Sequence, residues 1–323
     1  MIVQIYEIQT PDEAEKCIAA GVDHIGSVLL DQDRWRDPLL RETVAVSAGT
    51  GTKSSLIPIF HDEALLSSAV EYYRPDYIHF CETLIDPLGN PLDLKPLVHT
   101  QTRLKERFPE LGIIRSIPIP QPETFPDFPL LKIAEAFEKI SDLFLTDTWL
   151  PEAPVNGYIG ITGETCDWDM AAHLVRHSDL PVILAGGLSP ENVYDALIQA
   201  KGAGADSCTR TNRMGPDGQP IRFQKDFQKV RDFITKIRRA EAALDQEKQA
   251  LKTRLGALHE ELQDREKALP PHSVKPHQIM AIEALEEEIS QVEEALSAFK
   301  HIHAQGETPS SPDSGYGADP TGA

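Results

Sequence analysis

Long apolar runs are absent from this sequence, and their absence excludes a membrane-spanning helix. No stretch reaches the ~18 consecutive apolar residues that such a helix requires. The opening residues, MIVQIYE, also lack the basic start and long apolar stretch of a secretory signal peptide. We therefore expect a cytoplasmic protein.

Cysteine is scarce and scattered. The four cysteines, at positions 17, 81, 166 and 208, show no CxxC spacing and no nearby paired histidines. This pattern favours reduced thiols over a disulfide framework or a zinc site. We expect neither a metal nor a cofactor.

Basic residues are too few to balance the acidic ones. The chain has 31 Lys and Arg against 51 Asp and Glu, a formal net charge of −20. Nucleic acids and anionic membranes both require a basic face, so neither is an expected partner. If the chain binds an anion, the attraction must come from helix N-termini and single arginines.

Residues 1–237 repeat one pattern, a short apolar β-branched run followed by an amphipathic helical segment. Eight strands alternate with eight helices, and this rhythm is typical of a parallel sheet. The count predicts an α/β fold, a closed (β/α)₈ TIM barrel, with an open doubly wound sheet as the alternative. The expected strands are MIVQIYEI, HIGSVLL, SSLIPIF, DYIHF, GIIRSIPI, DLFLT, PVILAG and ADSCT.

The pattern changes after residue 237. Ile237, Leu244, Leu251 and Leu258 are seven residues apart, and a second apolar series begins at Ile282. The proline-rich segment 268–276 separates the two series. We predict an antiparallel, coiled-coil-like helical hairpin over residues 238–303, the alternative being a helix pair folded back on the barrel. The hairpin could mediate self-association or bind a partner protein, and the Gly-, Pro- and Ser-rich tail 304–323 is expected to be disordered.

Two glycine-containing turns stand out: GITGETCDW at 160–168 and LAGGLSPENV at 184–193. Gly186 and Gly187 follow the seventh expected strand, and Ser189 is expected to start the next helix. Turns after the seventh and eighth barrel strands often bind phosphate through backbone N–H groups. A Gly-Gly turn alone is a weak signal, because it could serve only a sharp bend between strand and helix.

The combination is more specific. Asp147 closes the sixth strand, the two glycine motifs follow in order, and Lys225-Asp226 opens the last helix. This set resembles the phosphoribosylanthranilate isomerase family of the tryptophan pathway, whose members perform an Amadori rearrangement on a phosphoribosyl amine. The resemblance covers residues 1–237 and extends to PDEAEKCIAAGVDHIGSVL, DRWRDP, PDYIHF and IIRSIPI.

The resemblance implies a TIM-barrel isomerase with Asp147 as the general acid. The reaction requires an acid to protonate the ring oxygen and a base to remove the C2 proton. The family carries its base as a cysteine in a first-strand sequence Lys-Ile-Cys-Gly, where this chain reads Gln-Ile-Tyr-Glu. Tyr6 and Glu7 are therefore candidate bases, and Cys81, Cys208 and His79 are alternatives.

The ligand-binding positions are only partly kept. Arg34, in DRWRDP, matches the family arginine that meets the anthranilate carboxylate, although it could equally be a solvated surface arginine. The family's Ser-Ser-Gly phosphate turn is replaced by Cys208, Thr209 and Arg210. Loss of the glycine removes part of the expected phosphate cup, for which Arg210 could supply charge.

Three functions are consistent with these residues. The first is a phosphoribosylanthranilate isomerase with an altered base. The second is a barrel enzyme that acts on another phosphorylated sugar. The third is a non-catalytic protein that binds a phosphorylated metabolite, or serves as a scaffold, and assembles through its helical hairpin.

Overall fold

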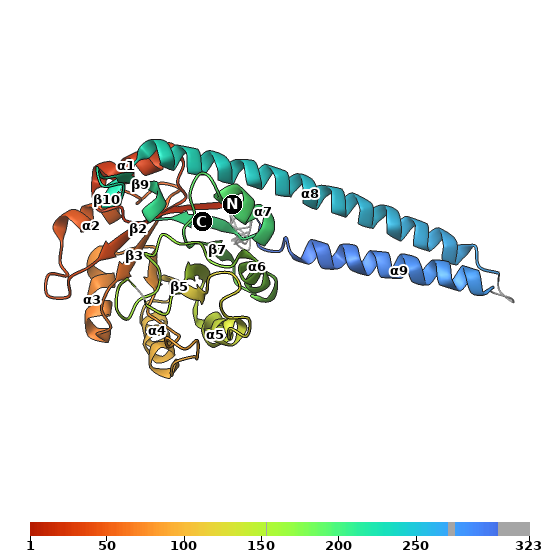
Figure 1. Cartoon of the computed structure of the whole chain (residues 1–323), viewed down its shortest axis with the longest axis horizontal. Coiled ribbons are helices and arrows are strands. Elements are labelled where there is room, and N and C mark those ends of the chain that lie inside the picture. The colour runs from red at the N-terminus through yellow and green to blue at the C-terminus, as the bar shows by residue number, and fades with distance from the viewer. Residues whose placement is uncertain (153, 271–274, 303–323) are drawn as a thin grey trace, which may run out of the picture.

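A computed structural model describes residues 1–152, 154–270 and 275–302. Eight parallel strands pair in chain order, and β8 closes the barrel on β1, as predicted (Figure 1). The open-sheet alternative is therefore wrong. The strands are β1 Ile2–Ile5, β2 His24–Leu29, β3 Lys53–Pro58, β4 Tyr77–Phe80, β5 Gly112–Ile119, β6 Leu143–Thr148, β7 Val182–Leu184 and β8 Gly204–Ser207.

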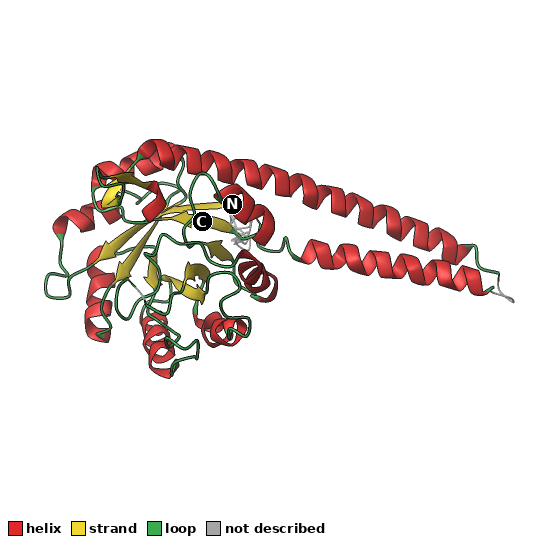
Figure 2. Cartoon of the chain, in the orientation of Figure 1, coloured by secondary structure: helices red, strands yellow, loops and turns green. Residues whose placement is uncertain are grey.

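Helices surround the barrel, and local sequence explains several of their starts (Figure 2). The Thr10 side chain accepts a hydrogen bond from the Glu13 N–H, and Pro11 occupies the first turn of α1. Asp167 caps α6 in the same way. The barrel helices before the C-terminal arm are α1 Pro11–Ala20, α2 Pro38–Ala45, α3 Glu63–Tyr73, α4 Lys95–Arg107, α5 Leu130–Phe137, α6 Trp168–His177 and α7 Val193–Ala200.

One helix start differs from the sequence prediction. Helix α7 begins at Val193, and Ser189 lies before it in a turn; the Ser189 carbonyl oxygen accepts a hydrogen bond from the Val193 N–H. The last barrel helix, α8, begins at Phe227 after Lys225-Asp226, as expected, and Asp226 caps it. An antiparallel pair that was not predicted precedes this helix: β9 Asn212–Met214 and β10 Pro220–Lys225.

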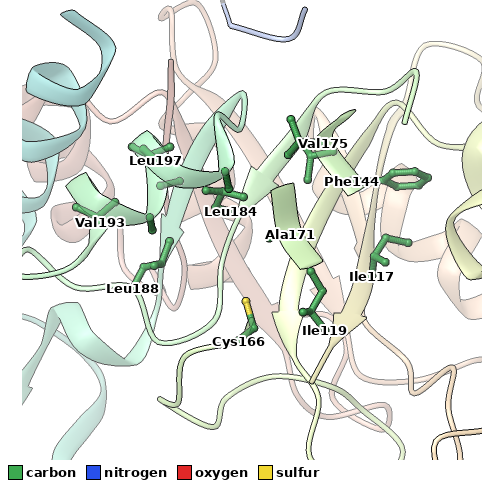
Figure 3. Packing of buried hydrophobic residues seen from close by; sticks show 14 of the residues in the cluster. Ile117, Ile119, Phe144, Cys166, Ala171, Val175, Leu184, Leu188, Val193 and Leu197 are labelled. Carbon is green, nitrogen blue, oxygen red and sulfur yellow. The ribbon is translucent and has the colours of Figure 1, made fainter. Parts of the chain in front are cut away.

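The largest hydrophobic core lies between the strands and their covering helices. Figure 3 shows Phe144 and Leu184 from the strands beside Ala171 and Val175 of α6 and Leu197 of α7. All five side chains are buried. This packing fixes the ends of β6 and β7, from which the glycine-containing loops emerge.

Helix α8, Phe227–Lys267, spans 41 residues and leaves the barrel to form one arm of a hairpin with α9, Pro276–Ser297 (Figure 1). Leu258, Leu285 and Ile289 form its small buried cluster. The expected domain boundary at 237 thus falls inside one continuous helix. The predicted tail, 304–323, lies outside the described residues. No described helix is both long and apolar enough to cross a membrane.

The hairpin is attached to the barrel at its base. Phe299 and Ile302, which follow α9, are buried in the main core. The His301 Nε2 atom lies 2.9 Å from the Ser178 carbonyl oxygen. The distal parts of α8 and α9 are therefore stabilised by packing against each other, whereas the base of the hairpin is stabilised by packing against the barrel.

We expect Leu258→Ala to loosen the distal hairpin and leave the barrel intact. Leu258 is 1% exposed, and truncation of a buried leucine costs roughly 2–5 kcal/mol. Hydrogen exchange should accelerate along α9 and stay unchanged in the barrel strands. The neighbouring exposed residue offers a control, His259→Ala, which should change neither. Faster hydrogen exchange throughout the barrel would show that the stability of the barrel depends on the distal hairpin.

Candidate active site

The C-terminal ends of the barrel strands surround a cavity with about 790 Å³ of empty space, its open mouth included. Eight of the nine residues predicted from the sequence line it. They are Tyr6, Glu7, Asp147, Gly186, Gly187, Cys208, Thr209 and Arg210. Strands far apart in the sequence therefore direct these residues to one site, as expected for a barrel.

Asp147, near the end of β6, lies under the loop that connects β6 to α6. Gly160 of this loop has φ +89° and approaches so closely that an added Cβ would lie 2.0 Å from Asp147 Oδ2. Burial raises the pKa of Asp147 to about 7, although a hydrogen bond from the Thr148 N–H opposes the shift. A carboxyl group that titrates near neutral pH can donate a proton.

The two glycine motifs meet at the cavity wall. A Cβ added to Gly187, whose φ is +59°, would lie 2.5 Å from the Glu164 carbonyl carbon. Thr148 Oγ1 donates to the Glu164 carbonyl oxygen at 2.6 Å and so fixes the loop beside the turn. The glycines are therefore required for close packing of two backbones, as well as for the bend between β7 and α7.

Backbone N–H groups near this contact are unpaired in the part of the chain that the structure describes. The N–H groups of Gly163, Gly187 and Thr209 have no hydrogen-bond partner within the described residues. Arg210, beside them, holds the loop by donating from Nε to the Gly163 carbonyl oxygen at 2.9 Å. Unpaired backbone donors beside an arginine suit the oxygens of a phosphate group.

Tyr6 points into the barrel, where it contacts β2, β3 and β4. Its ring takes up the space above Gly26, where an added Cβ would lie 2.0 Å from Tyr6 Cδ1. Its hydroxyl lies 2.6 Å from Ser55 Oγ and 2.7 Å from His79 Nδ1. Burial raises the pKa of Tyr6 well above its ordinary value. The phenol is therefore protonated at neutral pH and suited to donate a hydrogen bond.

Glu7 adopts φ +63°, a conformation that favours glycine, which the family carries at this place. Burial by itself would raise the pKa of Glu7. The hydrogen bond from Asn212 and the positive charges of Lys225 and Arg222 nevertheless hold it below the ordinary value. Glu7 is an ionised carboxylate paired with Arg222, which makes it a weak base.

The other candidate bases are also poorly suited to remove a proton. Burial lowers the pKa of His79 to about 3, and its Nε2 atom lies 2.8 Å from Ser116 Oγ. Burial raises the pKa of the Cys81 thiol and of the Cys208 thiol. A neutral thiol is a poor base.

Asp206 in β8 is a cavity residue that the sequence analysis missed. It is 6% exposed, and its Oδ1 atom has no partner in the described part of the chain. Burial and the nearby Asp147 charge raise the pKa of Asp206 to about 8. The expected strand ADSCT contained this aspartate, but the sequence does not show that it faces the cavity.

Arg34 is the predicted site residue that does not line the cavity. Its side chain is 88% exposed, and Nε contacts Asp31 Oδ2 at 2.7 Å. Arg222 of β10 does line the cavity, although the sequence analysis did not select it. A second arginine beside Arg210 at the cavity is thus supplied by the β9–β10 pair, which was not predicted.

The chain is similar to known proteins across this barrel. Residues 102–215 match the family model of N-(5'-phosphoribosyl)anthranilate (PRA) isomerase. N-(5'-phosphoribosyl)anthranilate isomerase 1 of Methanosarcina mazei is 23% identical over 247 residues, which cover 75% of this chain and 97% of that protein. An isomerase of the same name from Acetivibrio thermocellus is 37% identical over 114 residues, 35% of this chain and 48% of that one.

Across its barrel the chain is thus similar to phosphoribosylanthranilate isomerases. A solved phosphoribosyl anthranilate isomerase shares its fold, with a TM-score of 0.52 and 15% identity over 73% of this chain and 98% of that one. That protein was crystallised with reduced 1-(o-carboxyphenylamino)-1-deoxyribulose 5-phosphate.

The range matched by the isomerase model includes Asp147, both glycine motifs and Asp206. It begins within α4 and ends at residue 215. Tyr6, Glu7 and Arg222 lie outside it. Departures from the isomerase pattern therefore occur both outside this range, at Tyr6 and Glu7 after β1, and inside it, at Cys208–Arg210 after β8.

Proposed function

We propose that this protein catalyses the isomerisation of N-(5'-phosphoribosyl)anthranilate, an Amadori rearrangement of the tryptophan pathway. The observation that carries the proposal is the position of Asp147. Its carboxyl, with a pKa of about 7, faces the same cavity as the anion-binding backbone of Gly187. An acid beside a phosphate-binding turn is what ring opening of a phosphoribosyl amine requires.

The proposed reaction needs only proton transfers. Asp147 donates a proton to the ribosyl ring oxygen, the bond from C1 to that oxygen breaks, and the nitrogen lone pair forms the C=N bond. A base then removes the C2 proton to give the enolamine, which tautomerises to the ketose. No oxidant or second substrate is consumed.

We assign the base to Asp206. Asp147 and Asp206 line one cavity, and charge repulsion disfavours ionisation of both, so the pair loses its protons in two coupled steps. The singly ionised pair contains one acid and one base, and the reaction uses the form in which Asp147 keeps the proton and Asp206 is ionised. Tyr6, in this assignment, donates a hydrogen bond from its protonated hydroxyl.

Complementation tests the function most directly. Expression of the chain should restore growth without tryptophan to a strain that lacks the isomerase, and the purified protein should consume phosphoribosylanthranilate. Asp147→Asn should fail in both. If the unchanged protein also fails, while a phosphorylated ligand still raises its melting temperature, the binding-protein alternative would be favoured.

A second function, on a different phosphorylated sugar, is supported by one observation. The bulky Tyr6 ring occupies the place where the family carries its small cysteine. A cavity narrowed at this point could select another sugar amine. Turnover of such a compound, with none of phosphoribosylanthranilate, would establish this alternative.

We expect Gly187→Val to remove phosphate binding. A side chain at Gly187 would collide with the Glu164 backbone and displace the loop. A saturating phosphorylated ligand should stabilise the wild-type protein by about 2.7 kcal/mol at 100 times its Kd, and thermal unfolding should show no such shift in the variant.

Gly21→Val is the matched control for this substitution. Gly21 has φ +89°, so the substitution imposes similar backbone strain, but an added Cβ meets no atom within 4 Å. It ends α1, away from the cavity. The control should lose stability and keep the ligand-induced shift. An undiminished shift in Gly187→Val would place the phosphate elsewhere.

A further inference from the structure

The β9–β10 strand pair brings a cation to the cavity from outside the eight-fold pattern. It lies between β8 and α8 and pairs antiparallel across a turn that contains Gly218. Arg222 of β10 reaches the cavity wall, where its Nε donates to Glu7 Oε1 at 2.7 Å. The end of β1 is thereby joined to a segment more than 200 positions later in the chain.

The substrate of the proposed reaction has two anionic groups, the ribose phosphate and the anthranilate carboxylate. Among the described residues that line the cavity, Arg210 and Arg222 are the arginines, and there is no lysine. Arg210 stands beside the unpaired N–H groups of the phosphate site. Arg222 is therefore the cation that remains for the carboxylate.

The geometry of Arg222 suits this second anion. Its side chain is 40% exposed, and its guanidinium lies over the Phe223 ring at 4.7 Å from the centroid. Only Nε is bonded to Glu7; the two terminal nitrogens have no hydrogen-bond partner among the residues that the structure describes. A planar guanidinium with free terminal N–H groups can bind a carboxylate through two parallel hydrogen bonds.

Glu7 orients Arg222 without cancelling the positive charge of this region. Asn212 Nδ2 donates to Glu7 Oε2 at 2.9 Å, which holds the carboxylate in place. Lys225, 4% exposed, lies beneath, with its Nζ 2.6 Å from Asn212 Oδ1. Two cations against one carboxylate leave an excess positive charge at the end of β1, in a chain of net charge −20.

We propose that Arg222 binds the carboxylate of the aromatic amine, the role that the family resemblance gave to Arg34, and that Glu7 is its positioning residue. This inference rests on the proposed function, because it assumes a substrate with an ortho-carboxylate. It explains why Arg34 can be exposed and paired with Asp31.

The test is a binding cycle with two ligands, read by calorimetry without turnover. One is reduced 1-(o-carboxyphenylamino)-1-deoxyribulose 5-phosphate, and the other is the same compound without its carboxylate. Arg222→Gln should weaken the first roughly 10- to 100-fold, the range for loss of a charged hydrogen-bonded pair. Binding of the second should change less than about 3-fold, within the scatter of such contributions.

Three further variants sharpen the result. Arg213→Gln removes an exposed arginine of the same strand pair and should change neither affinity. Arg222→Lys keeps the positive charge but lacks the planar guanidinium group. Its affinity for the carboxylated ligand should lie between those of wild type and Arg222→Gln, and its affinity for the other ligand should be unchanged. Arg34→Gln should bind both ligands as tightly as wild type does. If Arg34→Gln instead weakens only the carboxylated ligand, and Arg222→Gln does not, the carboxylate is bound by Arg34.

Two other outcomes overturn the inference in distinguishable ways. If Arg222→Gln weakens both ligands equally, Arg222 has a general structural or phosphate role, while the proposed isomerase function stands. If the wild-type protein binds neither ligand, the proposed function fails together with the inference.

Discussion

Asp147→Asn is expected to lower kcat by roughly 10²- to 10⁴-fold, the usual contribution of a general acid. Asparagine keeps the shape of the side chain but cannot deliver a proton to the ring oxygen. Affinity for the reduced product analogue should change little, because the phosphate-binding backbone is untouched. Single-turnover kinetics and calorimetry measure the two effects separately.

The expected loss of kcat depends on how the loop after β6 surrounds the Asp147 carboxyl group. Gly160 places backbone against Asp147, and burial raises the pKa of Asp147 to about 7. Because the acid must be protonated, activity should fall at high pH, where both Asp147 and Asp206 are ionised. Asp169→Asn alters an exposed aspartate in α6, outside the cavity lining, and should leave kcat unchanged. Equal losses in both variants would indicate a structural effect.

The fold could be predicted because its pattern is local and repeated. Most strands are short apolar runs, and several helices have a start signal, such as Thr10-Pro11 before α1. Alternation of the two then fixes the topology, since parallel strands require a crossover between them. The long apolar series of α8 and α9 predicted the hairpin for the same reason.

The β9–β10 pair was missed because both strands are short and mostly not buried, so they lack the apolar runs by which the barrel strands were predicted. A usable signal exists in GPDG, residues 215–218, a turn sequence between two short strand-like runs. Its consequence for the site could not be predicted. The contact between Arg222 and Glu7 joins distant segments, and only tertiary structure brings them together.

Some candidate site residues could likewise be predicted from a local motif, whereas the position of others depends on tertiary structure. Gly187 and Asp147 could be found because a motif surrounds each of them. Arg34 could not be assigned, because whether its side chain faces the cavity or pairs with Asp31, three residues away, depends on the path of the loop. Asp206 was hidden because the inward direction of a strand residue depends on barrel register, here set by its pairing with Gln4.

Asp206→Asn is expected to lower kcat about as much as Asp147→Asn does, roughly 10²- to 10⁴-fold. Asp206 is the base in the proposed mechanism, since Glu7 is paired with Arg222 and its pKa is lowered. Tyr6→Phe should cost less than about 10-fold, the scale of one neutral hydrogen bond, because the buried phenol is already protonated. A larger loss in Tyr6→Phe than in Asp206→Asn would make Tyr6 the base.

The pH profile gives an independent check on this pair. The active form has Asp147 protonated and Asp206 ionised. Because the pKa of Asp147, about 7, is lower than that of Asp206, about 8, this is the less populated of the two singly ionised forms. Below this range both are protonated and no base remains, and above it both are ionised and no acid remains. We therefore expect kcat/KM to peak between about pH 7 and 8 and to fall on both sides.

Substrate deuterated at C2 separates the acid from the base. If Asp206 removes this proton, its loss makes that step limiting, and Asp206→Asn should show a larger deuterium isotope effect on kcat than wild type. Asp147→Asn should show no such increase, because its slow step is ring opening, in which the C2–H bond stays intact. If the isotope effect increases in Asp147→Asn and not in Asp206→Asn, Asp147 is the base and the two roles are exchanged. If it increases in neither variant, Asp206 does not take part in the proton transfer at C2.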